Sequence, residues 1–142
     1  MASIGFGSIA FHGPMPSWGE FLHDLSIVLT LVWVLLVEMK QERLLGWGLV
    51  GGVITSLTPV VADPAQALLA VGACGVMMRA GPRRHLRLTA LGILAIGAMV
   101  GTLSRTGGPL CRPDSIWQGH GFWHIAAAVA LGLWGSAIRP KP

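Results

Sequence analysis

Long stretches of apolar residues dominate this sequence and limit the folds that it can adopt. After a shorter piece at residues 2–12, they cover residues 22–37, 44–61, 65–78, 88–103 and 122–138. A helix needs roughly 20 apolar residues to cross the hydrocarbon core of a bilayer, and about 17–25 is usual. The last five stretches approach this length once their flanks are included, 65–78 being the shortest. We therefore expect an all-α fold, a polytopic transmembrane bundle of about five spanning helices.

The composition excludes a soluble domain. Only 11% of the residues are charged and 53% are hydrophobic, whereas a soluble domain carries about 25% charged residues. The formal charge of +4 does not indicate a nucleic-acid partner, because the Arg residues stand between apolar stretches, as in membrane loops. Cys74 lies within such a stretch, so we expect no disulfide with Cys111. Residues 1–142 are expected to form a single transmembrane domain.

The first apolar piece, residues 2–12, is too short to span a bilayer. It lacks the basic region that opens a signal peptide. We interpret it as an N-terminal half-helix, the last part of a helix whose beginning is absent. Glycine-rich runs at residues 46–52 and 92–101 predict places where membrane helices approach closely.

The Lys and Arg residues predict an orientation. Alternate loops place segments 38–43, 79–87 and the C-terminus on one side, with eight of the ten basic residues. Segments 13–21, 62–64 and 104–119 on the other side hold only Arg105 and Arg112. Basic residues favour the cytoplasmic side, so we expect a cytoplasmic C-terminus. The short chain suggests a bacterial inner membrane.

Four polar residues then fall at the non-cytoplasmic face: His12, Asp24, His120 and His124. Ionisable groups at membrane depth are costly, by roughly 2.5–3.5 kcal/mol for a central Asp on insertion scales, so they usually have partners and a function. His120 and His124 are four residues apart, which places both imidazoles on one helix face. Such a pair can share a metal, or the two can be interfacial histidines bonded to water or backbone.

Ser8 and His12 repeat the four-residue spacing. Ser8 could equally be a small packing residue and His12 a helix-end histidine. Three imidazoles and a water nevertheless make a standard open zinc site, in which the metal lowers the water's pKa to about 7. A nearby carboxylate can then move protons, and a hydroxyl can steady an oxyanion. Haem fits poorly, because two residues on one turn cannot take opposite axial positions on one iron.

As a set, Ser8-x-x-x-His12, Asp24 and His120-x-x-x-His124 resemble the alkaline ceramidase family, within a superfamily of seven-helix membrane hydrolases and adiponectin-type receptors. Two segments are similar to signatures of that family. They are Gly-Ser-Ile-Ala-Phe-His at residues 7–12 and Trp-Gln-Gly-His-Gly-Phe-Trp-His at residues 117–124. The resemblance covers nearly the whole chain. It departs from the family in lacking the first helix and the front of the second, and in Pro14 and Pro16 before Asp24.

The resemblance implies that His12, His120 and His124 bind zinc, with Ser8 and Asp24 beside the attacking water. Asp24 would take the proton of the water and pass it to the leaving amine, while Ser8 would steady the oxyanion. His23 directly precedes Asp24 and could exchange roles with it, although the pattern calls for a carboxylate. The resemblance also implies that Cys111 would pair with a cysteine near the N-terminus, in the part that is missing here.

The function expected from the sequence is zinc-dependent hydrolysis of the amide bond of a ceramide-like lipid, which would enter from the bilayer. The products would be a fatty acid and an amine. The alternative within the same superfamily is a non-catalytic, zinc-containing receptor or binding protein. A small membrane scaffold with incidental histidines is the third interpretation.

Overall fold

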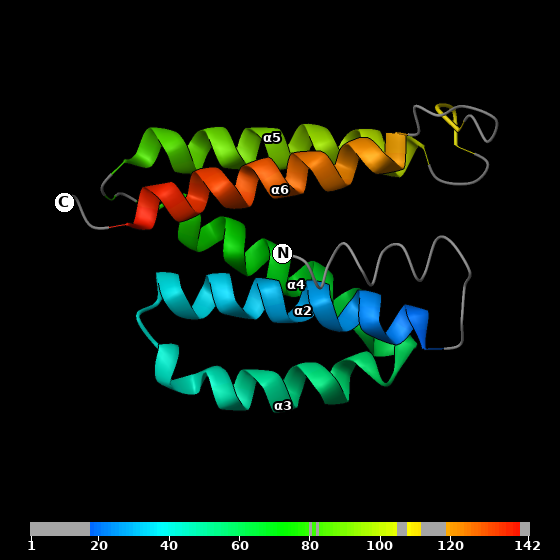
Figure 1. Cartoon of the computed structure of the whole chain (residues 1–142), viewed down its shortest axis with the longest axis horizontal. Coiled ribbons are helices and arrows are strands. Elements are labelled where there is room, and N and C mark those ends of the chain that lie inside the picture. Colours follow the sequence, from blue (N-terminus) through cyan, green and yellow to red (C-terminus); the bar gives the residue numbers. More distant parts are fainter. Residues whose placement is uncertain (1–17, 80, 82, 105–107, 112–118, 140–142) are drawn as a thin grey trace. The chain divides into compact units, whose positions relative to one another are not determined.

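The computed structural model describes residues 18–79, 81, 83–104, 108–111 and 119–139, apart from the side chains of Pro59 and His120. Within these ranges every regular element is helical, which confirms the expected all-α class (Figure 1). The chain divides into two compact units, residues 1–76 and 77–142. The elements are α2 (Gly19–Glu38), the 3-10 helix η1 (Glu42–Leu44), α3 (Leu45–Ser56), α4 (Pro59–Met77), α5 (Arg84–Leu103) and α6 (Gly119–Ile138).

Among the described helices, α2, α4, α5 and α6 are long and apolar enough to cross a membrane. Large apolar side chains on them are openly exposed, among them Val60 at 86% and Leu68 at 74%. An apolar surface of this kind is unfavourable in water and suits hydrocarbon. The chain is therefore an integral membrane protein, as the sequence predicts. The fifth helix, α3, is the exception, because it has only 12 residues.

The boundary between α3 and α4 differs from the prediction. Hydropathy predicts one helix over residues 44–61 and a loop at 62–64, but α3 ends at Ser56 and α4 begins at Pro59. The Thr58 carbonyl accepts hydrogen bonds from the N–H groups of Val61 at 2.8 Å and Ala62 at 3.0 Å. Proline suits the first helical position, because its missing N–H would have no partner there.

Pro64, which favours the predicted loop, lies inside α4 instead. Membrane helices tolerate an internal proline because neighbouring groups and local adjustments satisfy the freed carbonyl. The prediction of a loop at 62–64 is therefore wrong. The stretch that looks shortest in the sequence belongs to a full-length span, while the stretch before it forms the short helix.

In the first unit, α2 and α3 pack against each other through glycine. A Cβ added to Gly48 would lie 2.6 Å from Cγ1 of Val32, and one added to Gly52 would lie 2.8 Å from Cδ2 of Leu29. Real Cβ atoms do not approach other atoms so closely, so a larger residue at either position would have to displace the side chain of Val32 or Leu29. A Cβ on Gly46 or Gly51 would meet nothing within 4 Å, so the close contact is confined to one face of α3.

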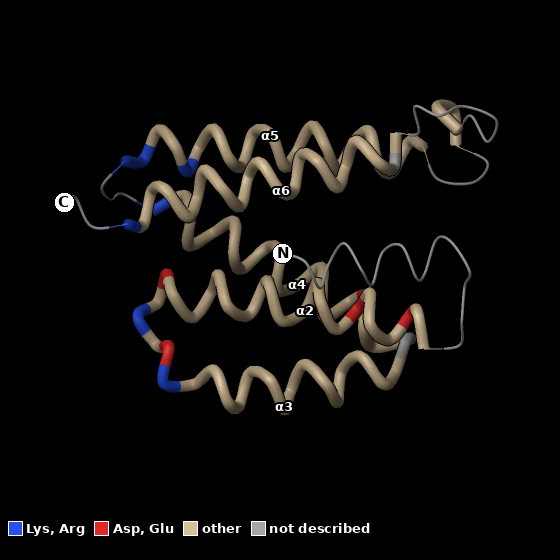
Figure 2. The backbone as a smooth tube through the Cα atoms, in the orientation of Figure 1, with Lys and Arg blue, Asp and Glu red and all other residues tan. Residues whose placement is uncertain are grey.

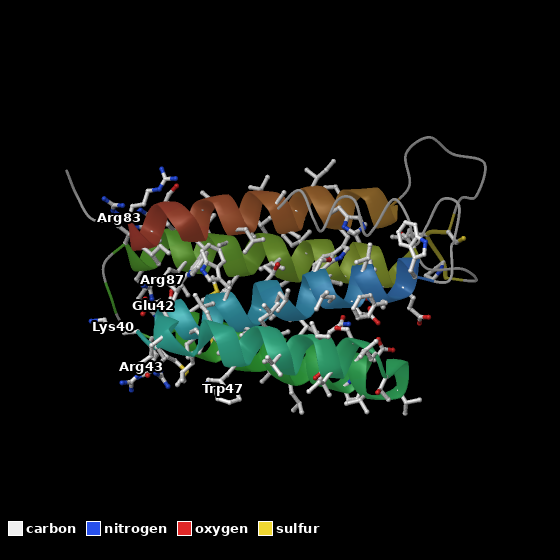
Figure 3. All side chains as sticks on the ribbon, turned by 60° about the horizontal axis from the view of Figure 1, so that its bottom comes forward. Lys40, Glu42, Arg43, Trp47, Arg83 and Arg87 are labelled. Atoms are coloured by element: carbon white, nitrogen blue, oxygen red, sulfur yellow. The ribbon has the colours of Figure 1, made fainter. Side chains whose placement is uncertain are left out.

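The turn between these two helices is built from a left-handed residue and charges of both signs. The N–H groups of Lys40 and Gln41 bond to the carbonyls of Val37 at 3.1 Å and Leu36 at 2.8 Å. Lys40 takes φ 56°, in the conformation that usually ends a helix with glycine. Acidic and basic residues alternate along the turn (Figures 2 and 3). They are Glu38, Lys40, Glu42 and Arg43.

In the second unit, α5 and α6 repeat the close approach through Gly97 and Gly101. A Cβ on Gly97 would lie 2.5 Å from Cβ of Ala126, and one on Gly101 would lie 2.9 Å from Cβ of Trp123. The same stripe of α6 continues as buried Ala130, Trp134 and Ala137. The predicted packing role of the glycine runs is therefore confirmed in both units.

We expect Gly97→Ala to destabilise the α5–α6 hairpin by about 1–3 kcal/mol, because the added methyl group must push Ala126 away. Gly92→Ala is the matched control on the same helix, since its Cβ would meet nothing within 4 Å. That control should be neutral or slightly stabilising, as alanine is the better helix former. Thermal unfolding of both variants in detergent measures the difference, and equal unfolding temperatures would contradict the packing.

Candidate functional site

Of the predicted site residues, the structure describes Asp24 and His124 fully and the backbone of His120. Asp24 lies in α2 of the first unit, and the two histidines lie in α6 of the second. Ser8 and His12 lie outside the described residues, as does the side chain of His120. The described residues contain no group of three or more His, Cys, Asp or Glu side chains that could hold a metal. The complete three-histidine site therefore stays a prediction.

His120 and His124 stand in the first two turns of a continuous helix, since α6 begins at Gly119. Residues four apart on an α-helix lie on one face, one above the other. The neighbouring face is anchored, because Trp123 packs against Gly97 and Gly101 of α5. Trp123 precedes His124 directly, so the contact that holds α6 against α5 also fixes the rotation of the helix that carries the histidines.

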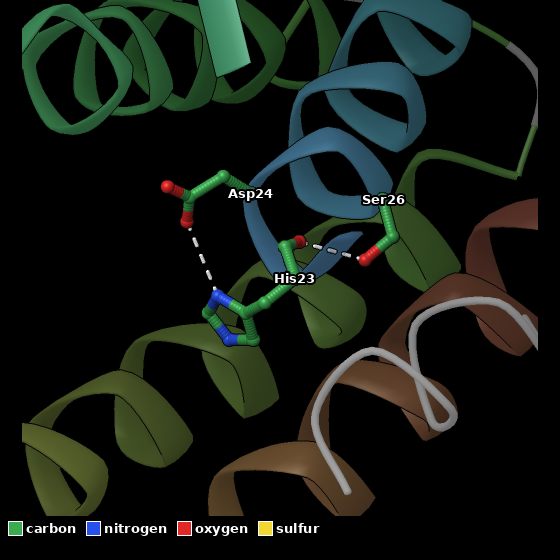
Figure 4. Close-up of polar contacts among 3 residues, drawn as sticks. All are labelled: His23, Asp24 and Ser26. Carbon is green, nitrogen blue, oxygen red and sulfur yellow. Dashed lines mark hydrogen bonds and ion pairs between the residues drawn. The ribbon is translucent and has the colours of Figure 1, made fainter. Parts of the chain in front are cut away.

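Asp24 is a buried acid within a membrane-spanning helix. The residue is 7% exposed, and its Oδ1 lies 3.2 Å from Nδ1 of His23 (Figure 4). An unsolvated carboxylate is costly, and contact with an imidazole N–H lowers that cost. The sequence left open whether His23 exchanges roles with Asp24. The geometry makes His23 a partner of the carboxylate.

The helix around this pair is held by its own hydroxyl groups. Ser26 Oγ donates to the carbonyl of His23 at 2.8 Å (Figure 4). Thr30 Oγ1 donates to the carbonyl of Ser26, also at 2.8 Å. Such bonds satisfy hydroxyls inside a membrane helix and often bend it slightly. A carboxylate beside an imidazole is a combination that general acid–base catalysis uses.

One polar residue near this level was missed by the sequence analysis. Ser56, at the end of α3, is 2% exposed, and its Oγ has no hydrogen-bond partner among the described residues. Gly48 faces Val32 and Gly52 faces Leu29. Extending this antiparallel register by one turn from Gly52 and Leu29 brings Ser56 to the level of Leu25, the neighbour of Asp24. The signal was present in the sequence, because Gly48, Gly52 and Ser56 form one series of small residues four apart.

The remaining polar candidates are the two cysteines, Asp63 and His85. Cys74 is an exposed free thiol, and Cys111 is a half-buried one. Asp63 is exposed and lies in α4 rather than in the predicted loop. His85 is exposed in the first turn of α5, next to Arg84.

No protein-family model, curated protein or solved structure matches this chain. Any assignment of function therefore depends on the residue pattern and on the placement of Asp24 and His124.

We expect Ser56→Ala to leave the protein as stable as the parent or to stabilise it by about 1 kcal/mol, because a buried hydroxyl without a partner carries a desolvation cost. Ser26→Ala is the control, since its hydroxyl donates to a carbonyl and its loss should not stabilise. Unfolding temperatures in detergent compare the two. A destabilised Ser56→Ala would instead reveal that the hydroxyl binds the Asp24 carboxylate or a buried water.

Proposed function

We propose that this chain is a zinc-dependent membrane amidohydrolase that cleaves the amide bond of an N-acylated, ceramide-like lipid to a fatty acid and an amine. The resemblance of Ser8, His12, Asp24, His120 and His124 to the alkaline ceramidase pattern supports it. The single observation that carries it is the buried Asp24 carboxylate beside His23 within a membrane-spanning helix. Such a group is expensive to keep at that depth unless it has a function.

The donor set suits zinc. Imidazole is among the preferred zinc ligands, and three of them leave a coordination position open. His12, His120 and His124 would hold the metal, and the helical spacing of the last two fits shared coordination. When bound, zinc would supply a Lewis acid and a nucleophilic water near neutral pH.

The other residues would carry the proton and the charge. Asp24 would accept the proton of the attacking water and pass it to the amine as the C–N bond breaks. His23 would hold the carboxylate in place through its 3.2 Å contact. The Ser8 hydroxyl would donate a hydrogen bond to the developing oxyanion. The substrate would enter from the bilayer, past the exposed apolar side chains of the helices.

The distribution of basic residues supports a cytoplasmic C-terminus and a site near the non-cytoplasmic face. The proposed location is the inner membrane of a bacterium.

Metal content tests the zinc site without measuring activity. We expect about one zinc per chain in the detergent-purified protein, lost in His120→Ala because two imidazoles bind zinc far more weakly than three. His85→Ala is the control, as His85 is exposed at the start of α5, and should keep its zinc. Elemental analysis gives the ratio. Equal zinc in all three proteins, or none in any, would contradict the site.

Asp24→Asn tests the reaction. We expect it to keep its zinc and to lose about 10²–10⁴-fold in lipid amide turnover, because an amide cannot act as the general base. Asp63→Asn, an exposed position on α4, is the control and should retain full turnover. Mass spectrometry of the fatty acid released from mixed micelles measures the rate. If zinc-loaded parent protein leaves ceramide-like lipids unchanged, the hydrolase proposal fails and the receptor alternative replaces it.

A further inference from the structure

The second unit gathers basic residues at one end of the α5–α6 hairpin (Figure 2). Arg83, just before α5, donates from Nη1 to the carbonyls of Ser136 and, at 3.2 Å, of Arg139. These carbonyls belong to the C-terminal end of α6, where a cation is favoured by the unsatisfied C=O groups and the helix dipole. One arginine therefore fastens the beginning of α5 to the end of α6.

That contact brings other like charges together. Arg84 follows Arg83 in the chain, and Arg139 is held by its own carbonyl against the Arg83 guanidinium. Both Arg84 and Arg139 are exposed, as is Arg79 in the preceding loop. We call Arg79, Arg84 and Arg139 the arginine patch. Positive charges at one end of the hairpin repel one another, and an anion bound there relieves that repulsion.

None of the described residues of the second unit is acidic. Residues 77–142 contain one acidic residue, Asp114, which stands in the connection between α5 and α6 and lies outside the described residues. The α2–α3 turn provides the contrast, because Glu38 and Glu42 alternate there with Lys40 and Arg43 (Figures 2 and 3). Both connections carry basic residues, as loops at a membrane surface often do. Only the connection before α5 carries them without acidic neighbours.

The first turn of α5 adds to this imbalance. It contains no acidic residue, and Arg83 provides no side-chain cap. Basic residues there are repelled by the positive N-terminal end of the helix dipole. An anion would be favoured by the dipole and by the unsatisfied N–H groups. The first turn of α5 therefore favours a bound anion, and no described residue of the second unit supplies one.

We propose that the arginine patch binds the phosphate of an anionic phospholipid headgroup. The patch stands at the ends of two helices that cross the membrane by length and composition, where the headgroups of the bilayer lie. Guanidinium groups bind phosphate oxygens in a bidentate manner, and basic pockets between membrane helices recognise such headgroups. This inference is independent of the hydrolase proposal, because it uses none of the same residues.

Native mass spectrometry of the full chain, titrated with phosphatidylglycerol or phosphatidylcholine, tests the proposal. We expect saturable binding of about one phosphatidylglycerol per chain, with phosphatidylcholine bound much more weakly. Arg84→Gln/Arg139→Gln should weaken phosphatidylglycerol binding about tenfold or more, as each basic residue contributes to headgroup attraction. Lys40→Gln/Arg43→Gln removes the same charge from the mixed turn and should leave the affinity unchanged.

Arg84→Lys/Arg139→Lys keeps the charge and protects the test against misfolding of the glutamine variant. It should bind phosphatidylglycerol with intermediate affinity, because lysine lacks the bidentate fork. An equal loss in both glutamine double variants, or equal binding of the two lipids, would overturn the proposal in favour of diffuse attraction. Displacement of the lipid by millimolar inorganic phosphate would overturn it in favour of a site for free phosphate.

Discussion

The close approach of helix backbones at glycine is the constraint on which the rest of this structure depends. Inside a bilayer no hydrophobic force drives helices together, so association depends on van der Waals packing and polar contacts. Gly48 and Gly52 provide that packing in the first unit, and Gly97 and Gly101 provide it in the second. The register of the first contact sets the level of Ser56 against α2. The second fixes Trp123, and with it the rotation of His124.

Residue spacing was enough to predict much of the fold, because hydropathy, glycine runs and helical periodicity are local properties. It failed between α3 and α4, where Val60 and Val61 continue an apolar run across a real helix boundary. Hydropathy assigns a value to each residue and does not register a turn between two equally apolar neighbours. Thr58 and Pro59 form the actual boundary between the helices, whereas Pro64 favoured a loop further along the chain.

The candidate site was predictable only as a set of residue types. The spacing of His120 and His124 fixes their common face once the helix exists, and α6 is continuous through both. The burial of Asp24 and the isolation of Ser56 depend on which helix faces meet, and that depends on contacts between segments distant in sequence. Arg83 shows the same limit, since its acceptors are backbone carbonyls of α6. A count of charges along the sequence cannot distinguish Arg83 from the other basic residues.

The length of α3 has a consequence for the surrounding lipid. Its 12 residues rise about 18 Å, against a hydrocarbon core of about 30 Å. Its outer side is apolar, with Trp47 at 76% and Ile54 at 62% exposure (Figure 3). This hydrophobic mismatch is met by thinning of the adjacent leaflets or by flanking groups that reach the interface. We therefore infer that the bilayer is locally thinner beside α3 than beside α2, or that the residues flanking α3 reach further to the interface.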